Sequence, residues 1–359
     1  MCSMKKIFIK TFGCQMNVYD SQKILRLLED KYEAVDSPAE ADLVIINTCS
    51  VRDKPEQKVY SYLGELKDLK QKKDEFLIGV GGCVAQQEGE NIIKRSKLVD
   101  FVFGTHNISL VPALINERLL SGKAVSALDY RDGWEALPIG LGGTRGVSSY
   151  VAISRGCNKK CSYCIVPTTR GGEVSRDSKE VLREVKYLVD KGVKEIVLLG
   201  QTVNSYGIDL KPQVSFASLL DLVSDINGLE RIRFTSPHPN FMTKDLIACV
   251  ASNPKVCHHF HVPLQSGNDR ILKLMKRGYT QARYMQMIED IKNAVPDMAF
   301  TADVIVGFPS ETREEFSDTV EVMRKVPFSA SFSFAFSPRP NTPAATMTYQ
   351  ISQEEKLDR

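Results

Sequence analysis

The chain has 359 residues, of which 43% are hydrophobic and 25% charged, values that are ordinary for a soluble globular protein. No apolar run approaches the roughly 20 residues of a membrane-spanning helix, and no signal-peptide pattern follows Met1, so the sequence predicts a cytoplasmic protein without a membrane partner. Because 47 basic residues nearly balance 44 acidic ones, any nucleic-acid surface must come from local clustering of charge.

The first 121 residues alternate short apolar segments with longer helical ones. The strand candidates, rich in β-branched residues, are Lys6–Thr11, Leu43–Asn47, Phe76–Gly81 and Phe101–Phe103. The helical stretches are Tyr19–Lys31, Pro55–Lys70, Gln86–Lys94 and Ile108–Leu120. Such alternation is typical of a parallel sheet with helices on its faces. We therefore predict an α/β N-terminal domain, residues 1–121, built on a doubly wound parallel sheet.

Glycine-rich turns separate this region from a second alternating one. Residues 122–148 contain Arg131-Asp132-Gly133 and Leu141-Gly142-Gly143 and are predicted to be an interdomain linker. The strand candidates that follow are Tyr150–Ser154, Glu195–Leu199, Arg231–Thr235, His258–Val262, Ala299–Val306 and Ser329–Phe336. The predicted helices are Lys179–Asp190, Phe216–Ile226, Thr243–Ala251, Tyr279–Asn293 and Thr312–Arg324. Six such units predict a partial (β/α)6 barrel of the TIM type over residues 149–359.

Three cysteines of the N-terminal region each follow a predicted strand. Cys14, Cys49 and Cys83 lie 35 and 34 residues apart. The C-terminal ends of parallel strands meet at one edge of a sheet, so the three thiols are expected to converge there. Small flanking residues would let a bulky group approach the backbone. We interpret these cysteines as the ligands of an iron–sulfur cluster with one open iron; the alternative is three buried apolar cysteines.

A second, denser cysteine group follows the first predicted barrel strand. Cys157, Cys161 and Cys164 have the spacing C-x3-C-x2-C. Three thiolates on one loop can hold three irons of a [4Fe-4S] cubane and leave the fourth iron open to a ligand. A structural zinc site is the alternative, but zinc prefers four ligands and paired C-x2-C knuckles. In a reducing compartment, clustered cysteines indicate metal binding or catalysis before disulfides.

The remaining cysteines, Cys2, Cys249 and Cys257, have no such partners and are interpreted as structural or incidental. Cys257, His259 and His261 would share one face of a strand, which imitates a metal site. We favour packed barrel side chains there, because the two cysteine groups already account for the redox chemistry.

The C-x3-C-x2-C group, with the aromatic Tyr163 before its third cysteine, resembles the radical S-adenosylmethionine (SAM) superfamily. The resemblance implies that the open iron binds the amino and carboxylate groups of SAM. An electron from the cluster then cleaves SAM to a 5′-deoxyadenosyl radical. Tyr163 would lie against the adenine ring of SAM.

A radical SAM barrel preceded by a three-cysteine domain resembles the methylthiotransferase family. The matching stretches are Thr11–Asn17, Asn47–Arg52, Gly81–Glu90, Arg170-Gly171 through Ser175-Arg176, Leu199–Gly207, Pro263–Gly267, Val306–Pro309 and Phe336–Pro340. Their flanks resemble the branch that acts on N6-isopentenyladenosine at position 37 of tRNA. The resemblance implies methylthiolation of carbon 2 of that base with two SAM molecules, one as methyl donor and one as radical source.

The same resemblance implies cofactors and partners. The cofactors are SAM and two [4Fe-4S] clusters, one SAM-binding and one auxiliary. The partners are the tRNA anticodon stem-loop, an external electron donor and a sulfur donor, and the protein is expected to be monomeric. The family usually continues into a C-terminal RNA-binding TRAM domain, which this chain, ending at Arg359, lacks. Asn341 stands where the family tends to have glycine, and Asn tolerates the left-handed backbone.

Polar residues near predicted barrel strand ends are candidates for contacts with SAM or the base. At strand ends, the candidates for binding SAM are Gln201, Asn204, Ser236 and Gln265, and those for the RNA substrate are His238 and Asp303. Tyr163, by the resemblance, and Arg176, through its guanidinium, are further candidates for SAM, and Arg339 is one for the RNA. Loop capping and turn chemistry are the alternative role for most of them, and a phosphate of tRNA is a second anion for Arg176. No catalytic residue is predicted beyond the cluster ligands.

Two other functions remain open at this point. A sister methylthiotransferase acting on threonylcarbamoyladenosine in tRNA, or on an aspartate of a ribosomal protein, would share both clusters. A non-catalytic iron–sulfur electron-transfer protein would not depend on SAM and would leave the two open irons unexplained.

Overall fold

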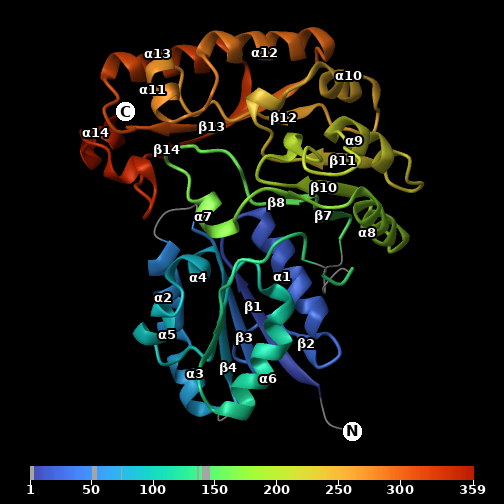
Figure 1. The fold of residues 1–359 in the computed structure, drawn as a ribbon, viewed down its shortest axis with the longest axis vertical. Helices are drawn as coiled ribbons and strands as arrows, with labels where there is room; N and C mark the ends of the chain where they lie inside the picture. Colours follow the sequence, from blue (N-terminus) through green and yellow to red (C-terminus); the bar gives the residue numbers. More distant parts are fainter. Residues whose placement is uncertain (1–3, 51–54, 74, 136, 140–145) are drawn as a thin grey trace. The chain divides into compact units, whose positions relative to one another are not determined.

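The computed structural model describes residues 4–50, 55–73, 75–135, 137–139 and 146–359 (Figure 1). It divides into two compact units. Unit 1 is Met1–Val147 together with Thr168–Gly171, and unit 2 is Ser148–Pro167 together with Gly172–Arg359. The predicted linker 122–148 lies partly outside the described residues, as do Cys2 and the family-like residues Val51 and Arg52.

Unit 1 is built on a six-stranded, wholly parallel sheet with the order β2-β1-β3-β4-β5-β6. Its strands are β1 (Lys5–Thr11), β2 (Tyr32–Ala34), β3 (Leu43–Thr48), β4 (Leu77–Gly82), β5 (Phe101–Phe103) and β6 (Val125–Ala127). The chain moves from β1 outward to β2 and then back across β1 to β3, which is the order of doubly wound folds. The predicted fold class is confirmed.

Helices cover both faces of this sheet (Figure 1). They are α1 (Gln15–Leu28), α2 (Pro55–Glu65), α3 (Lys67–Lys72), α4 (Cys83–Glu88), α5 (Asn91–Arg95), η1 (Ile108–Leu110) and α6 (Val111–Ser121). Alternate residues of the buried strands serve two cores. Val44 and Ile46 pack in one with residues of α2, α4 and α5, and Leu43 and Ile45 pack in the other with residues of α1 and α6.

Two strands of unit 1 were not predicted. β2 and β6 are three-residue edge strands, too short to show an alternating pattern. The single predicted helix Pro55–Lys70 is two helices, α2 and α3, and the predicted Gln86–Lys94 is likewise α4 and α5. A glycine, Gly89, takes a left-handed φ of +57° between α4 and α5, which ends α4.

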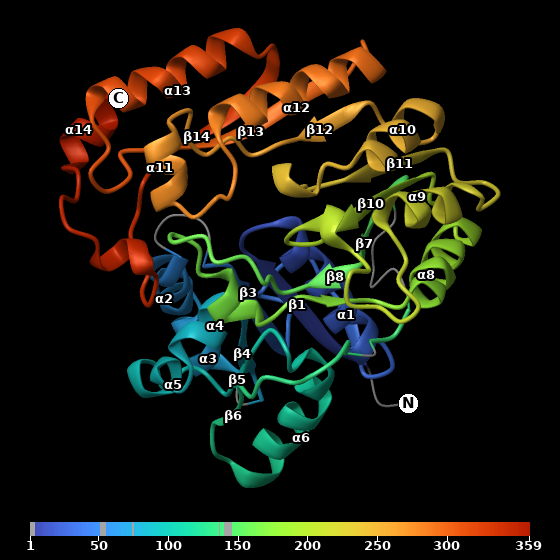
Figure 2. The same ribbon diagram turned by 45° about the horizontal axis from the view of Figure 1, so that its top comes forward.

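Unit 2 contains two three-stranded parallel sheets, β11-β10-β7 and β12-β13-β14 (Figure 2). The strands are β7 (Ser148–Ala152), β10 (Glu195–Leu199), β11 (Arg231–Phe234), β12 (His259–His261), β13 (Ala299–Val306) and β14 (Phe328–Ala335), with a short antiparallel pair β8 (Ser154–Arg155) and β9 (Val174–Ser175). An isolated parallel bridge pairs Ile232 of β11 with Val256, in the segment that leads into β12. The six strands thus follow one another in chain order, which is the arrangement of a partial barrel.

The helices of unit 2 lie between its strands in the chain, and the last two follow β14. They are α7 (Val166–Arg170), whose last residues belong to unit 1, α8 (Ser178–Asp190), η2 (Val203–Ser205), α9 (Phe216–Ser224), η3 (Pro239–Phe241), α10 (Lys244–Ser252), α11 (Asp269–Leu274), α12 (Gln281–Ala294), α13 (Arg313–Lys325), η4 (Pro343–Thr346) and α14 (Gln353–Asp358). Several begin at side-chain caps, and Thr312 and Glu315 form a capping box at α13. Within the described parts of the chain, no helix is both long and apolar enough to cross a membrane.

Candidate functional site

The three cysteines of unit 1 lie at the C-terminal ends of three neighbouring strands. Cys14 is the residue before α1, Cys49 directly follows β3, and Cys83 is the first residue of α4. β1, β3 and β4 are adjacent and parallel, and the register places Thr48 beside Gly82, so Cys49 and Cys83 leave the sheet side by side. The topology therefore brings all three cysteines to one edge of the sheet.

Two glycines let the cysteine loops approach one another. A Cβ on Gly13 would lie 2.1 Å from the Cβ of Cys49 and 2.8 Å from its Sγ, and a Cβ on Gly82 would lie 2.4 Å from the carbonyl oxygen of Thr48. Both glycines have a positive φ, +115° and +90°. Only glycine satisfies both the space and the backbone conformation at these two positions.

A Gly13→Ala substitution is expected to disrupt this cysteine site. The strained φ alone should cost more than about 1 kcal/mol, and the new methyl group would displace the Cys49 side chain. The measurement is iron bound after anaerobic reconstitution, which should fall relative to the parent protein. Gly64→Ala is the matched control, because a Cβ there meets nothing within 4 Å. Equal iron content in both variants would contradict the packing described here.

Polar side chains form hydrogen bonds that hold the cysteine loops of unit 1 in place. The amide of Asn17 donates to the carbonyl oxygen of Thr48 at 2.7 Å, while its Oδ1 accepts from the Cys14 thiol at 3.3 Å. Arg170 is buried and donates through Nη2 to Asp20 at 2.8 Å and to the same Asn17 oxygen at 3.4 Å. Although Arg170 follows the second cysteine group in sequence, it belongs to unit 1.

This environment favours the thiolate form of Cys14. A hydrogen bond from the Cys49 thiol lowers the pKa of Cys14 to about 6, and the positive charge of Arg170 adds to the effect. A thiolate is the form that binds metal. Three cysteine thiols without a fourth protein ligand are the donor set of a cluster with one open iron, whereas zinc prefers four ligands, so this donor set fits a cluster better than zinc.

The cysteine loop of unit 2 lies just beyond β7 and β8 and is firmly tethered. Ser162, between the second and third cysteines, donates through its backbone N–H to the Met275 carbonyl at 3.1 Å and through its hydroxyl to the Leu274 carbonyl at 2.8 Å. Its own carbonyl accepts from the N–H of Ala344 at 2.8 Å. Tyr163 packs against the apolar cluster that includes Phe308. The loop is therefore preorganised by contacts with distant segments.

The three thiols of this loop are close enough to influence one another electrostatically. Burial raises the pKa of Cys164 to about 12, and the neighbouring Cys161 and Cys157 raise it further. Burial also raises the pKa of Cys157, whose sulfur lies 3.6 Å from the Thr202 hydroxyl. Since burial disfavours the thiolate forms of Cys157 and Cys164, a positive group is needed to hold them as thiolates, and coordination to iron would supply that charge. The donor set fits an iron–sulfur cluster.

One predicted SAM-binding residue carries a polar atom that suits a ligand. Oε1 of Gln201, just after β10, is buried and has no hydrogen-bond partner among the described residues. An unsatisfied buried acceptor costs free energy, and a bound donor such as an amino group would remove that cost. This atom supports the assignment of Gln201 to the SAM site.

Other predicted SAM-binding residues serve the protein backbone. The side-chain amide of Asn204 exchanges two hydrogen bonds with the backbone of His238, at 3.0 and 2.8 Å. Ser236 and Gln265 adopt left-handed conformations, with φ of +60° and +65°. Gln265 also bridges to β13 through its backbone. These residues shape the ends of the barrel strands, and direct contacts with SAM stay a prediction.

The guanidinium of Arg176 is buried in an ion pair with Glu184, and its Nε lies 3.7 Å from Glu180. Its carbonyl accepts from the Tyr206 hydroxyl at 2.7 Å. The SAM carboxylate or a phosphate could bind Arg176 only if the guanidinium contacted that anion and Glu184 at the same time.

His238 is a buried histidine that should stay neutral. Burial lowers its pKa to about 3, and the charges of Arg277 and Lys159 act in the same direction. Its Nδ1 accepts from the N–H of Asn240 at 3.2 Å, which places the proton of the neutral ring on Nε2.

This neutrality is directly measurable. Since the folded pKa lies well below the ordinary value, the ring should not gain a proton between pH 8 and pH 5. NMR of the protein carrying ¹³C-labelled histidine should show one ring resonance that does not shift over that range and that disappears in His238→Gln. A titration of that resonance near pH 6.5 would contradict the assignment.

The predicted substrate residue Asp303 belongs to a polar row on the β12–β13 sheet. His261 contacts the Thr301 hydroxyl through Nδ1 at 3.0 Å and Asp303 through Nε2 at 3.2 Å, and His259 contacts the same hydroxyl at 3.0 Å. The interpretation of Cys257, His259 and His261 as packed barrel side chains stays a prediction. Arg339 lies in the turn after β14, where its carbonyl accepts two hydrogen bonds from Thr342.

Sequence reasoning missed four residues of the two sites. Asn17 and Arg170 in unit 1, and Thr202 and Arg277 in unit 2, contact the cysteines or their loops. Asn17 lies three residues from Cys14, and Asn17, Arg170 and Thr202 all lie in the family-like stretches, which were the available signals. Arg277 is brought to its cysteine by tertiary structure alone.

Comparison with known families first defines the class of enzyme. A model described as "Uncharacterized protein family UPF0004" matches residues 6–104, and the Radical SAM superfamily model matches residues 151–323. The radical SAM methyltransferase TsrM from Kitasatospora setae superposes with a TM-score of 0.68 at 14% identity, covering 96% of this chain and 74% of that one. The cobalamin-dependent radical SAM enzyme OxsB gives 0.64 at 10% identity, covering 99% and 56%. These likenesses show the fold, and the protein is a radical SAM enzyme.

Curated relatives narrow the class further. The tRNA-2-methylthio-N(6)-dimethylallyladenosine synthase of Geobacter sulfurreducens is 48% identical over 362 residues, covering 100% of this chain and 81% of that protein. The enzyme of the same name from Aquifex aeolicus is 48% identical, covering 99% and 81%. The chain belongs to the tRNA-2-methylthio-N(6)-dimethylallyladenosine synthase family, which confirms the predicted resemblance.

Proposed function

We propose that this protein attaches a methylthio group to carbon 2 of N6-isopentenyladenosine (dimethylallyladenosine) at position 37 of tRNA, using two SAM molecules. The observation that carries the proposal is a pair of three-cysteine groups, one at the strand ends of a doubly wound sheet and one on a loop of a radical SAM barrel. The names of relatives that are 48% identical over the whole chain support the choice of substrate.

The six cysteines would be the ligands of two [4Fe-4S] clusters. Cys157, Cys161 and Cys164 would hold the SAM-binding cluster, and Cys14, Cys49 and Cys83 would hold the auxiliary cluster of a methylthiotransferase domain, residues 1–121. When bound, the first cluster supplies the electron that cleaves SAM, and the second supplies an iron that can carry sulfur.

The protein's own groups prepare these two sites. In unit 1, the charge of Arg170 and the backbone N–H of Asn17 favour the thiolate of Cys14. In unit 2, Ser162 holds the cysteine loop in place through its backbone N–H and its hydroxyl. Gln201 offers its buried acceptor to SAM. Tyr163, Arg176, Asn204, Ser236 and Gln265 are the other proposed SAM contacts, and His238, Asp303 and Arg339 are the proposed RNA contacts.

Exposed aromatic residues on β14 extend the proposed RNA surface. Phe332 and Phe334 are 58% and 47% exposed, and β14 lies at the edge of its sheet. Phe332 pairs in register with Asp303, so both aromatic rings share the face of the sheet that carries the polar row. Exposed aromatic rings are platforms on which unpaired bases stack, at about 1–3 kcal/mol per base.

A Phe332→Ala/Phe334→Ala double variant is expected to raise the KM for an anticodon stem-loop by about tenfold or more, from the lost stacking. SAM cleavage in the absence of RNA should not change. Leu222→Ala removes an exposed apolar side chain on α9 and serves as the control. A KM equal to that of the control would show that Phe332 and Phe334 of β14 do not bind the RNA.

Partners beyond the substrate complete the proposal. An external reductant must supply electrons, and a sulfur donor must replace the sulfur that each turnover consumes. We further propose that the protein acts as a monomer in the cytoplasm. A C-terminal TRAM domain, expected from the family, would add affinity for tRNA.

The experiment compares two stem-loops, one carrying isopentenyladenosine and one carrying threonylcarbamoyladenosine at position 37. Protein reconstituted anaerobically with iron and sulfide would be incubated with SAM and dithionite, and the nucleosides examined by mass spectrometry. A methylthio mass gain on the isopentenylated base alone is expected. A gain on the threonylcarbamoylated base alone would instead establish the sister activity.

A further inference from the structure

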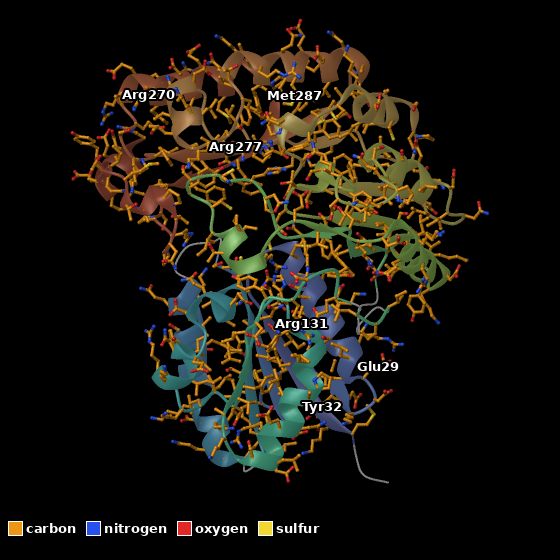
Figure 3. The ribbon with its side chains drawn as sticks, viewed as in Figure 1. Glu29, Tyr32, Arg131, Arg270, Arg277 and Met287 are labelled. Carbon is orange, nitrogen blue, oxygen red and sulfur yellow. The ribbon has the colours of Figure 1, made fainter. Side chains whose placement is uncertain are left out.

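Arg277, in the turn after α11, directs a buried positive charge at one cluster cysteine. Its Nη1 donates to the Sγ of Cys161 at 3.3 Å, and the residue is only 7% exposed. Its Nε donates to the Tyr279 hydroxyl at 3.1 Å, and the guanidinium lies 5.3 Å from the centre of that ring. Figure 3 labels Arg277 in unit 2, below the helices α11 and α12 in that view.

No carboxylate pairs with Arg277 among the residues that the structure describes. Two of the other buried arginines have one: Arg170 pairs with Asp20 and Arg176 with Glu184. A buried charge without a counter-charge is costly, so such a residue needs an anion close by. The group in contact with Arg277 that can become anionic in the folded protein is the sulfur of Cys161.

The surroundings fix the position of this guanidinium. The Tyr279 hydroxyl donates to the carbonyls of Leu264 at 2.9 Å and Pro263 at 3.1 Å, so its lone pairs face Arg277. The backbone of Arg277 is held at both ends, by a bond from its N–H to the Leu272 carbonyl and by one from the Asn240 amide to its carbonyl. Arg277 is therefore preorganised rather than free to move toward solvent.

We propose that Arg277 is a positioning residue that serves as the counter-cation of the SAM-binding cluster and sets its reduction potential through Cys161. The inference rests on the proposed function of the Cys157–Cys164 loop. Reduction adds an electron and makes the cluster more negative, so a nearby cation and an N–H···S bond stabilise the reduced form. Arg277 thus raises the potential and eases transfer of an electron from an external donor.

The two cysteine sites differ in this respect. Arg170, a buried arginine of unit 1, is neutralised by Asp20 at 2.8 Å, whereas Arg277 donates to the uncharged Tyr279 and lies near His238, whose pKa is lowered. A full, uncompensated charge acts more strongly on its cluster than an ion pair does. The larger electrostatic effect is therefore expected at the SAM-binding cluster.

The test is a potentiometric titration followed by EPR, with full-length protein in which Cys14, Cys49 and Cys83 are replaced by alanine so that one cluster remains. Arg277→Gln should lower the midpoint potential, and Arg277→Lys, which keeps the charge, should lower it less. Arg270→Gln, which removes an exposed arginine paired with Glu315, should leave the potential unchanged.

Three outcomes would overturn the inference. One is an Arg277→Gln protein with full iron content and the parent potential. Another is an equal shift in Arg277→Gln and Arg270→Gln. The third is loss of the cluster in both Arg277→Gln and Arg277→Lys, which would assign Arg277 to holding the loop. The titration uses no RNA, so failure of the methylthiolation assay leaves its result intact.

Discussion

A Cys14→Ala variant is expected to cleave SAM to 5′-deoxyadenosine but to lose methylthiolation of the RNA. Removing Cys14 leaves the auxiliary site of unit 1 with two thiols, Cys49 and Cys83, while the cysteine loop of unit 2 keeps all three of its own. Methylthiolated product should fall by more than about 100-fold, since losing a ligand costs more than the 10–100-fold typical of outer-shell changes. Mass spectrometry of the nucleosides and of the SAM products measures both reactions in one sample.

The control for this experiment is Cys249→Ala. Cys249 is a buried cysteine on α10 whose thiol lies near Asp221, far in sequence from either cysteine group. Its replacement should leave both products unchanged. Undiminished methylthiolation by the Cys14→Ala protein would show that Cys14 is not a ligand of a required cluster.

A Cys164→Ala variant is expected to lose both products. Cys164 is one of the three proposed ligands on a loop held by Ser162. Among the described residues, that loop has no fourth cysteine that could replace it. Without the SAM-binding cluster no electron reaches SAM, so 5′-deoxyadenosine should fall to background. About half of the bound iron should remain, because the auxiliary site is intact. Cys257→Ala is the matched control, and 5′-deoxyadenosine at the control level would contradict the ligand assignment.

Local patterns predicted the elements that carry the sites. β5 and β13 have the residues that were expected, and the strand-end positions of Cys49 and Cys83 followed from strand periodicity and the geometry of parallel sheets. The edge strands β2 and β6 were missed, because an alternation of apolar and polar residues cannot be recognised in only three residues. Helix ends shifted by a few residues, as expected where capping competes with propensity.

The residues that contact the cysteines or their loops could not be predicted in the same way. Arg170 and Arg277 are single basic residues in loops or at a helix end, and their sequence neighbours do not distinguish them from solvent-exposed arginines. What makes them important is tertiary: Arg170 joins unit 1 beside Asn17, and Arg277 reaches Cys161 across 116 positions of sequence. Burial of a charge is decided by the whole fold and leaves no local pattern.

The most direct test of the account is the stoichiometry of SAM products in one anaerobic reaction with the isopentenylated stem-loop. The account predicts S-adenosylhomocysteine, 5′-deoxyadenosine and a methylthio group on the nucleoside, with at least one molecule of each SAM product for every methylthio group formed. A methylthiolated nucleoside without 5′-deoxyadenosine, or no 5′-deoxyadenosine from protein shown to hold both clusters, would contradict the assignment of this chain as a radical SAM methylthiotransferase.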